Sequence, residues 1–254
     1  MLDELHFPSI RKMFVPDPGY TFFGSDFAQA DARVVAWDAD CPRLKKIFLD
    51  PDRDLHDENA IDLFGKLTKH SRQLAKGGVH AVNYYCKAPT LAKTLGISTD
   101  AAQRFIDKWF TLNPEVYDWQ QRIENDIHTT GKVSNIWGFD YHFKDRPDRL
   151  LPDALAWVGQ STVAIAIKVA MDNLIKLEDA RDDFQVLHQV HDEILGQFKT
   201  NSYTEIRPLI QSNMTIHVPY DDPLILPVDM KASRKSWGHC KAVPWVDNHN
   251  FCPY

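Results

Sequence analysis

The residues that could carry out chemistry include two groups of acids far apart in the chain. His191–Glu193 lies between two short apolar runs, which predicts a β-hairpin with adjacent carboxylates at its tip. Far upstream, the strand-like run Tyr20–Asp26 also ends in a carboxylate. Neighbouring acids occur on solvated turns as well as around hard cations, and the hairpin alone does not separate the two interpretations. If folding brings Asp26 and Asp192 together, they form a carboxylate pair suited to two-metal, in-line phosphoryl transfer.

A third segment is basic, although the whole chain has a formal net charge of −6. From Lys66 to Lys93 the sequence contains lysines and an arginine but no acid, and such a patch can hold phosphates on an acidic protein. A four-residue spacing, which places side chains on one side of a helix, is shared by Arg72, Lys76, His80 and Tyr84. A solvated helix face would explain the charges but neither the missing acids nor the spacing.

These three segments resemble the motifs of family A DNA polymerases. Ser25–Arg33 (SDFAQADAR) resembles motif A, usually written DYSQIELR, and Gln189–Glu193 (QVHDE) is similar to motif C. Arg72–Tyr84, with its recurring Arg, Lys, aromatic and Tyr, resembles motif B. The motifs come in the family's order and at its separations, and the resemblance covers residues 10 to 238.

The resemblance implies an α+β fold, with an antiparallel palm sheet and a helical fingers insertion. The first part of the palm is expected at residues 1–55, the fingers at 56–150 and the second part of the palm at 151–254. Pro89 is expected to end the basic helix. Apolar periodicity predicts the following elements: a strand at 20–26, helices at 54–63, 71–85, 98–110, 114–131, 152–180 and 203–217, hairpins at 133–143 and 185–198, and a strand at 224–230.

The implied reaction is attack of a primer 3′-hydroxyl on the α-phosphorus of a deoxynucleoside triphosphate (dNTP), with release of pyrophosphate. Asp26 and Asp192 are expected to bind two Mg²⁺ ions, or Mn²⁺ in their place, with the carbonyl of Phe27 as a further ligand. Glu193 is expected to support this site. Lys76 is expected to act as a proton donor to pyrophosphate.

Further residues are implied as ligands of the substrates. The expected dNTP contacts are Arg72, Lys76, His80, Tyr84, His56, Gln29 and Asp31. The expected DNA contacts are Gln160, His191 and Arg11. A structural role is the other interpretation for His56, and a hydrogen bond inside the core is the other interpretation for Gln160.

Four positions depart from the family's pattern. His80 stands where Phe or Tyr is usual, and Tyr85 stands where a Gly usually ends the helix. Asp31 replaces a Glu that packs against the sugar, and Ala156 replaces an Asn that contacts DNA. These departures concern fidelity and sugar discrimination more than the reaction itself.

The composition is that of an ordinary globular protein, with 44% hydrophobic and 25% charged residues among 254. Without a signal peptide or a long apolar run, we expect a cytoplasmic protein with no membrane partner, in a bacterial host cell if a phage encodes it. The scattered cysteines suit a reducing compartment. A zinc site built from His239, Cys240, His249 and Cys252 is an alternative, but its spacing matches no standard zinc pattern.

Only 25 residues precede Asp26, which leaves no room for the family's thumb or proofreading exonuclease. The expectation is either an excised fragment or a phage-like split polymerase with a separate thumb and exonuclease polypeptide. Two other functions remain open. A two-metal nuclease could use Asp26, Asp192 and Glu193 but would not need the basic ladder, and a degenerate polymerase could bind DNA or a replisome partner without catalysis.

Overall fold

The computed structural model describes residues 9–144 and 150–243, which form two compact units. Of the described residues, 9–28, 164–217 and 225–243 form the sheet unit, and 29–144, 150–163 and 218–224 form the helical unit. The expected boundaries after residues 55 and 150 are not the boundaries of these units, and the assignment to palm and fingers stays a prediction. The mixture of helices with an antiparallel sheet confirms the predicted α+β class.

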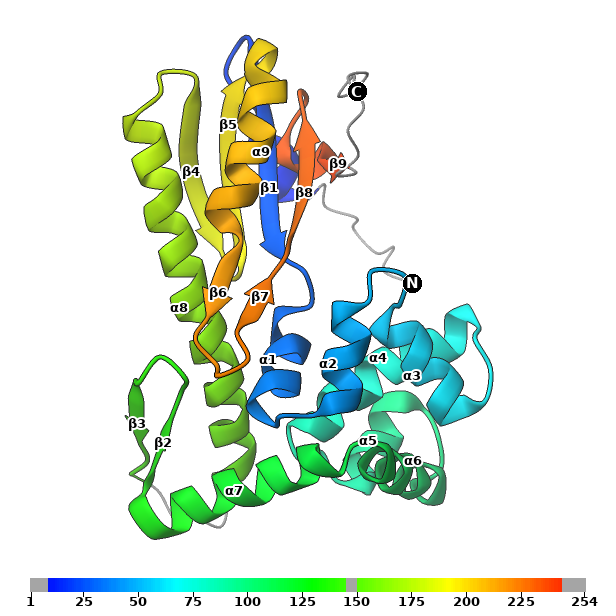
Figure 1. The fold of residues 1–254 in the computed structure, drawn as a ribbon. Helices are drawn as coiled ribbons and strands as arrows, with labels where there is room; N and C mark the ends of the chain where they lie inside the picture. Colours follow the sequence, from blue (N-terminus) through cyan, green and yellow to red (C-terminus); the bar gives the residue numbers. More distant parts are fainter. Residues whose placement is uncertain (1–8, 145–149, 244–254) are drawn as a thin grey trace, which may run out of the picture. The chain divides into compact units, whose positions relative to one another are not determined.

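The sheet unit is built on five antiparallel strands in the order β4-β5-β1-β8-β9, with β1 in the centre (Figure 1). The strands are β1 (Tyr20–Phe27), β4 (Phe184–Val190), β5 (Glu193–Lys199), β8 (Val228–Ser233) and β9 (Lys241–Ala242). The predicted strand at 224–230 is in fact two, β7 (Leu224–Leu226) and β8. Pro227 separates them and has no backbone N–H to donate to a ladder.

One face of this sheet is its apolar core. The ring of Phe23 on β1 stacks on Phe184, with centroids 5.5 Å apart, and lies 6.1 Å from Phe198. Gly196 is required beside them, because a β-carbon there would lie 2.4 Å from the Phe23 ring and 2.4 Å from a backbone oxygen. Helix α9 (Tyr203–Met214) lies against the sheet (Figure 1) and buries side chains four residues apart. The helix predicted at 203–217 ends at Met214, three residues earlier than predicted, and the chain continues as β6 (Ile216–Val218).

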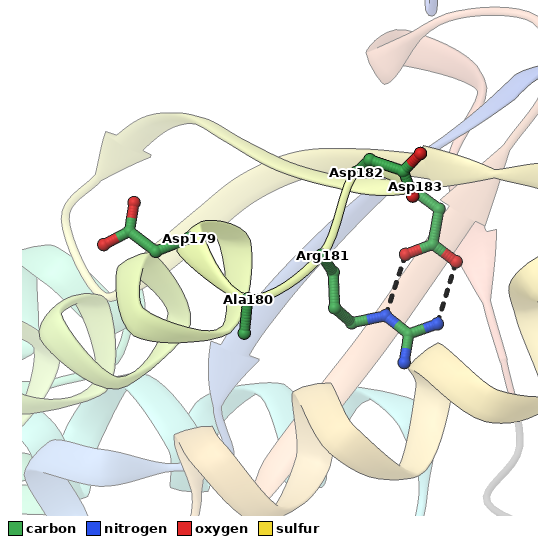
Figure 2. Close-up of a pocket in the computed structure, with 5 residues that line it drawn as sticks. All are labelled: Asp179, Ala180, Arg181, Asp182 and Asp183. Atoms are coloured by element: carbon green, nitrogen blue, oxygen red, sulfur yellow. Dashed lines mark hydrogen bonds and ion pairs between the residues drawn. The ribbon is translucent and has the colours of Figure 1, made fainter.

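A bidentate ion pair holds the turn that leads into β4. Nε and Nη2 of Arg181 donate to the two carboxylate oxygens of Asp183 at 2.8 and 2.9 Å (Figure 2). Nη2 also donates to Glu205 on α9 at 3.3 Å. The hydrogen bonds from Arg181 lower the pKa of Asp183 well below its ordinary value. The turn lines the shallow pocket drawn in Figure 2, and its ion pairs anchor the hairpin that carries His191–Glu193.

The helical unit contains most of the helices. They are α1 (Ala30–Asp38), α2 (Pro42–Leu49), α3 (Leu55–Phe64), α4 (Lys69–Asn83), α5 (Ala88–Leu95), α6 (Thr99–Leu112) and α7 (Pro114–Thr130), followed by the hairpin β2 (Lys132–Ser134) and β3 (Asp140–His142). Local signals determine their starts: Asp54 accepts two backbone N–H bonds at the start of α3, and Ser98 accepts one at the start of α6. The expectation that Pro89 ends the basic helix is wrong. That helix ends at Asn83, and Pro89 lies in the first turn of α5, where its missing N–H costs no hydrogen bond.

Helix α8 (Leu151–Asp179) runs from the helical unit into the sheet unit. By length and composition it could cross a membrane, and it is the one such helix in the part of the chain that the structure describes. Half of its most apolar window is buried inside the protein, so the helix is weak support for a membrane span. The helix predicted at 152–180 from its apolar residues is confirmed.

Candidate active site

Three acids of the sheet unit share one face of the sheet. Asp26 on β1 lies opposite Glu193 on β5 and opposite Asp229 on β8, and residues paired directly across antiparallel strands point to the same face. Asp192 lies in the turn just before β5, where His191 adopts a left-handed conformation at φ 55°. The structure therefore brings Asp26 and Glu193 together, with Asp192 in the adjoining turn.

Asp229 was not predicted as a site residue. Its neighbours Val228 and Met230 are buried while Asp229 is exposed, and this alternation was the signal in the sequence that could have revealed it. The alternation predicts that Asp229 points outward from a strand, but it does not predict which strand pairs with that one. Only the pairing of β8 with β1 places Asp229 beside Asp26.

A lysine lies among these acids. Nζ of Lys231 donates to a carboxylate oxygen of Asp26 at 3.0 Å. Burial lowers the pKa of Lys231, but the hydrogen bond to Asp26 and the charges of Glu193 and Asp229 outweigh burial and raise it. Gly24 gives Glu193 room, since a β-carbon at Gly24 would lie 2.5 Å from the Glu193 carboxylate.

The donor chemistry of this face fits a hard divalent cation, because carboxylate oxygens are the ligands that Mg²⁺ takes in proteins. Within residues 9–144 and 150–243, however, no three His, Cys, Asp or Glu side chains converge as a preformed metal cluster. Asp26 is already bonded to Lys231. A metal ion bound by Asp26 would therefore be repelled by the ammonium group beside it.

The zinc alternative gains no support. Burial raises the pKa of the Cys240 thiol to about 12, with a further contribution from Glu193, and zinc binds the deprotonated thiolate. Nδ1 of His239 lies 2.7 Å from the hydroxyl of Ser236. The other two residues of the alternative, His249 and Cys252, lie outside the described residues.

In the helical unit, α4 carries most of the basic ladder. A capping box of Thr68 and Ser71 starts the helix. Arg72 is half-exposed, and Lys76 and His80 are exposed, whereas the opposite side of the helix is buried. The predicted shared side is confirmed for these three residues.

Tyr84 lies just beyond the end of α4, and its hydroxyl is buried with no hydrogen-bond partner. Burial raises its pKa, and the charge of Asp31 raises it further. Its ring meets that of His80 edge to face, with centroids 4.9 Å apart. The next residue, Tyr85, has φ 65°, a left-handed conformation that favours glycine. The family's usual Gly is therefore replaced at a position where the backbone conformation favours Gly.

Arg72 is bonded to two acids near the start of α3. Its Nε donates to Asp57 at 2.5 Å, and its Nη2 donates to both carboxylate oxygens of Asp54 at 3.1 Å. His56 lies between these acids in the sequence, and burial lowers its pKa. The charge of Asp54 opposes this shift, whereas the charges of Arg72 and Lys76 lower the pKa further. The structure thus brings His56, Arg72 and Lys76 within electrostatic reach of one another, with His56 neutral at pH 7.

The remaining predicted site residues lie on separate elements. Gln29 precedes α1 in a left-handed conformation at φ 54°. Gln160 is exposed on α8, so the interpretation as a buried core glutamine is wrong. Arg11 lies in a 3₁₀ turn at Ile10–Met13, where its guanidinium stacks 4.4 Å from the ring centroid of Trp237.

Comparison with known proteins gives concordant matches. A family model described as "DNA polymerase family A" matches residues 4–239. A thermostable DNA polymerase I of Thermus filiformis is 29% identical over 227 residues, which cover 85% of this chain and 27% of that protein. DNA polymerase I of Helicobacter pylori is 27% identical over 241 residues, covering 91% of this chain and 27% of that protein. The chain spans about a quarter of the length of these curated relatives.

A solved structure is also similar. It is the POL domain of Pol1 from M. smegmatis, in a complex with DNA primer-template and dNTP. The TM-score is 0.80 at 27% sequence identity, and the match covers 90% of this chain and 42% of that one.

Proposed function

The chain belongs to DNA polymerase family A, and on this basis we propose that it is the catalytic part of a DNA-directed DNA polymerase. It joins a dNTP to the 3′-hydroxyl of a primer under the direction of a template and releases pyrophosphate. The observation that carries this proposal is the register of β1 with β5, which pairs Asp26 with Glu193 next to Asp192. The structural likeness to a POL domain complexed with primer-template and dNTP supports it.

In the proposed site, Asp26 and Asp192 hold two Mg²⁺ ions, or Mn²⁺ in their place, with the carbonyl of Phe27 as a further ligand. Bound metal would lower the pKa of the primer hydroxyl and neutralise charge on the leaving phosphates. Glu193 keeps the carboxylate face negative beside Asp26. Lys231 would oppose this metal binding, because its ammonium group repels a second cation at Asp26.

The helical unit is proposed to bind the nucleotide. Arg72 and Lys76 bind the phosphates, and Lys76 donates a proton to the leaving pyrophosphate. His56, kept neutral by burial and by the neighbouring cations, donates a hydrogen bond without adding charge. The residues proposed for the base and sugar are His80, Tyr84, Gln29 and Asp31. The orphan hydroxyl of Tyr84 and its proximity to Asp31 support the sugar assignment.

The proposed DNA contacts are Gln160, His191 and Arg11, of which Gln160 is exposed. Duplex affinity depends largely on phosphate neutralisation, and this chain is acidic overall. We therefore propose that a separate polypeptide with a thumb and an exonuclease, of a phage-like split enzyme working in the cytoplasm, grips the duplex. Exposed apolar side chains near the start of the chain offer it a contact: Ile10, Met13 and Val15, with 68%, 78% and 63% exposure.

The direct test is primer extension by the purified chain and by Asp192→Asn. Asp182→Asn is a matched control, because that carboxylate also lies beside β4 but is 95% exposed and remote from the acids of the site. We expect incorporation by the wild type and the control, and a loss of about 10²-fold or more in Asp192→Asn. Primer binding without incorporation by the wild type would favour the degenerate polymerase, and equal activity of Asp192→Asn would refute the site.

A further inference from the structure

The arginine proposed to bind the triphosphate is bonded to acids of its own chain. Nε of Arg72 donates to Asp57, and Nη2 donates to Asp54. All three side chains are partly open to solvent, with 41% exposure for Arg72, 36% for Asp54 and 37% for Asp57. A soluble anion can therefore reach the pair.

The pairing occupies the edge of the guanidinium that a phosphate would use. Nε and Nη2 form one of the flat edges with which arginine binds phosphate or carboxylate through two parallel hydrogen bonds. Two carboxylates against one guanidinium also leave the cluster with a net charge of −1, which repels a polyphosphate. A phosphate chain must displace at least one carboxylate before it gains the full contact with Arg72.

The two acids differ in their other roles. Asp54 also caps α3, where its carboxylate accepts the backbone N–H groups of His56 and Asp57 at 2.9 Å. The Asp57 carboxylate accepts a hydrogen bond from Arg72. Asp57 also lies in the first turn of α3, where an acid is favourable to the helix dipole. The dipole accounts for an acid at this position but not for its contact with Arg72.

We propose that Asp57 is a positioning residue that competes with the nucleotide's phosphates for Arg72. The inference rests on the proposed function and deepens it. Because every phosphate chain that uses Arg72 must break the same pair, Asp57 weakens the binding of dNTP and of pyrophosphate by the same factor. It thereby favours release of the pyrophosphate product, and it leaves the binding of an unphosphorylated nucleoside unchanged.

The test compares Asp57→Asn with the wild type in equilibrium titrations, without primer, using dATP, pyrophosphate and deoxyadenosine as probes in Mg²⁺ buffer. Asparagine keeps the size of the side chain and removes its charge. Asp107→Asn is the matched control, since Asp107 is an exposed helical acid of the same unit whose carboxylate accepts a hydrogen bond from Gln103. Circular dichroism and thermal melting establish that the variants are folded.

We expect Asp57→Asn to bind dATP and pyrophosphate about two- to fivefold more tightly, as for a half-exposed ion pair. Deoxyadenosine binding and the Asp107→Asn control should not change. In an Arg72→Ala background, Asp57→Asn should give no gain, because the pair is already absent. A merely structural role would not tighten binding of both phosphate ligands by a common factor.

The outcomes separate two failures. If the wild type binds dATP and extends a primer but Asp57→Asn binds phosphate ligands no more tightly, the inference is overturned and the proposed function stands. The same holds if the gain persists without Arg72. If neither protein binds dATP, the proposed function fails, and the inference fails with it.

Discussion

Replacing Lys231 with alanine should strengthen divalent metal binding by the sheet unit. The ammonium group of Lys231 lies 3.0 Å from the carboxylate of Asp26, on the face that also carries Glu193 and Asp229. It acts as a resident cation among three acids. A metal ion that binds Asp26 is repelled by this ammonium group from nearby.

The size of this effect follows from the contact distance. A metal–oxygen bond of about 2.1 Å added to the observed 3.0 Å contact places the two cations about 5 Å apart. At that separation, a single charge and a double charge repel by about 1.7 kcal/mol in a water-like dielectric. Physiological salt roughly halves this for a side chain that is 41% exposed. The expected gain in metal affinity is therefore about fourfold.

The assay is a Mn²⁺ titration of the metal-free protein, followed by calorimetry or electron paramagnetic resonance, with no substrate present. Lys235→Ala is the control, because this exposed lysine carries the same charge and lies beyond the end of β8. Loss of the half-exposed ion pair itself should change stability by no more than about 1 kcal/mol. Unchanged or weaker Mn²⁺ binding in Lys231→Ala, compared with Lys235→Ala, would refute the resident-cation argument.

Three further changes test the fold and the specificity. Gly196→Ala should destabilise the protein by about 3 kcal/mol, because the new β-carbon would lie 2.4 Å from Phe23 and from a backbone oxygen. Denaturant unfolding measures this cost, and a value below about 1 kcal/mol would contradict the packing. The lowered pKa of Asp183 contributes stability above pH 4 that is lost as the pH falls towards its folded-state pKa. Arg181→Ala should therefore cost more stability at pH 6 than at pH 2.5, and an equal cost at both would count against the pairing. Asp31→Glu should raise the ratio of deoxy- to ribonucleotide incorporation, since the longer acid closes more tightly over the sugar, and an unchanged ratio would remove Asp31 from that role.

Local signals predicted much of the fold. Alternating and helical apolar patterns located β1, the β4–β5 hairpin, α7 and α8 to within a few residues, because burial of one face imposes its period on the sequence. The segment after the basic helix was harder to predict. Pro89 reads equally well as a stop or as the first turn of a new helix, and only the structure shows α5 there.

For the candidate site, the sequence alone determined which groups are present and on which elements they lie. The acids at 26, 192 and 193 and the basic side of α4 follow from residue type and spacing, since spacing decides which side chains share a face. The sequence also marked Tyr85 as an exception, and its left-handed backbone gives the physical reason for the glycine usual there.

The tertiary structure decided the partner of each charge. Lys231 meets Asp26 across 205 residues because β8 pairs with β1 in one register, and a slip of a single residue would turn Lys231 to the other face. Arg72 meets Asp57 and Asp54 through the packing of α3 on α4. Electrostatic interaction depends on distance through space, which neither composition nor spacing along the chain supplies. The sequence therefore predicted a carboxylate site and a basic helix side, and the fold placed a cation beside the first and two acids beside Arg72 of the second.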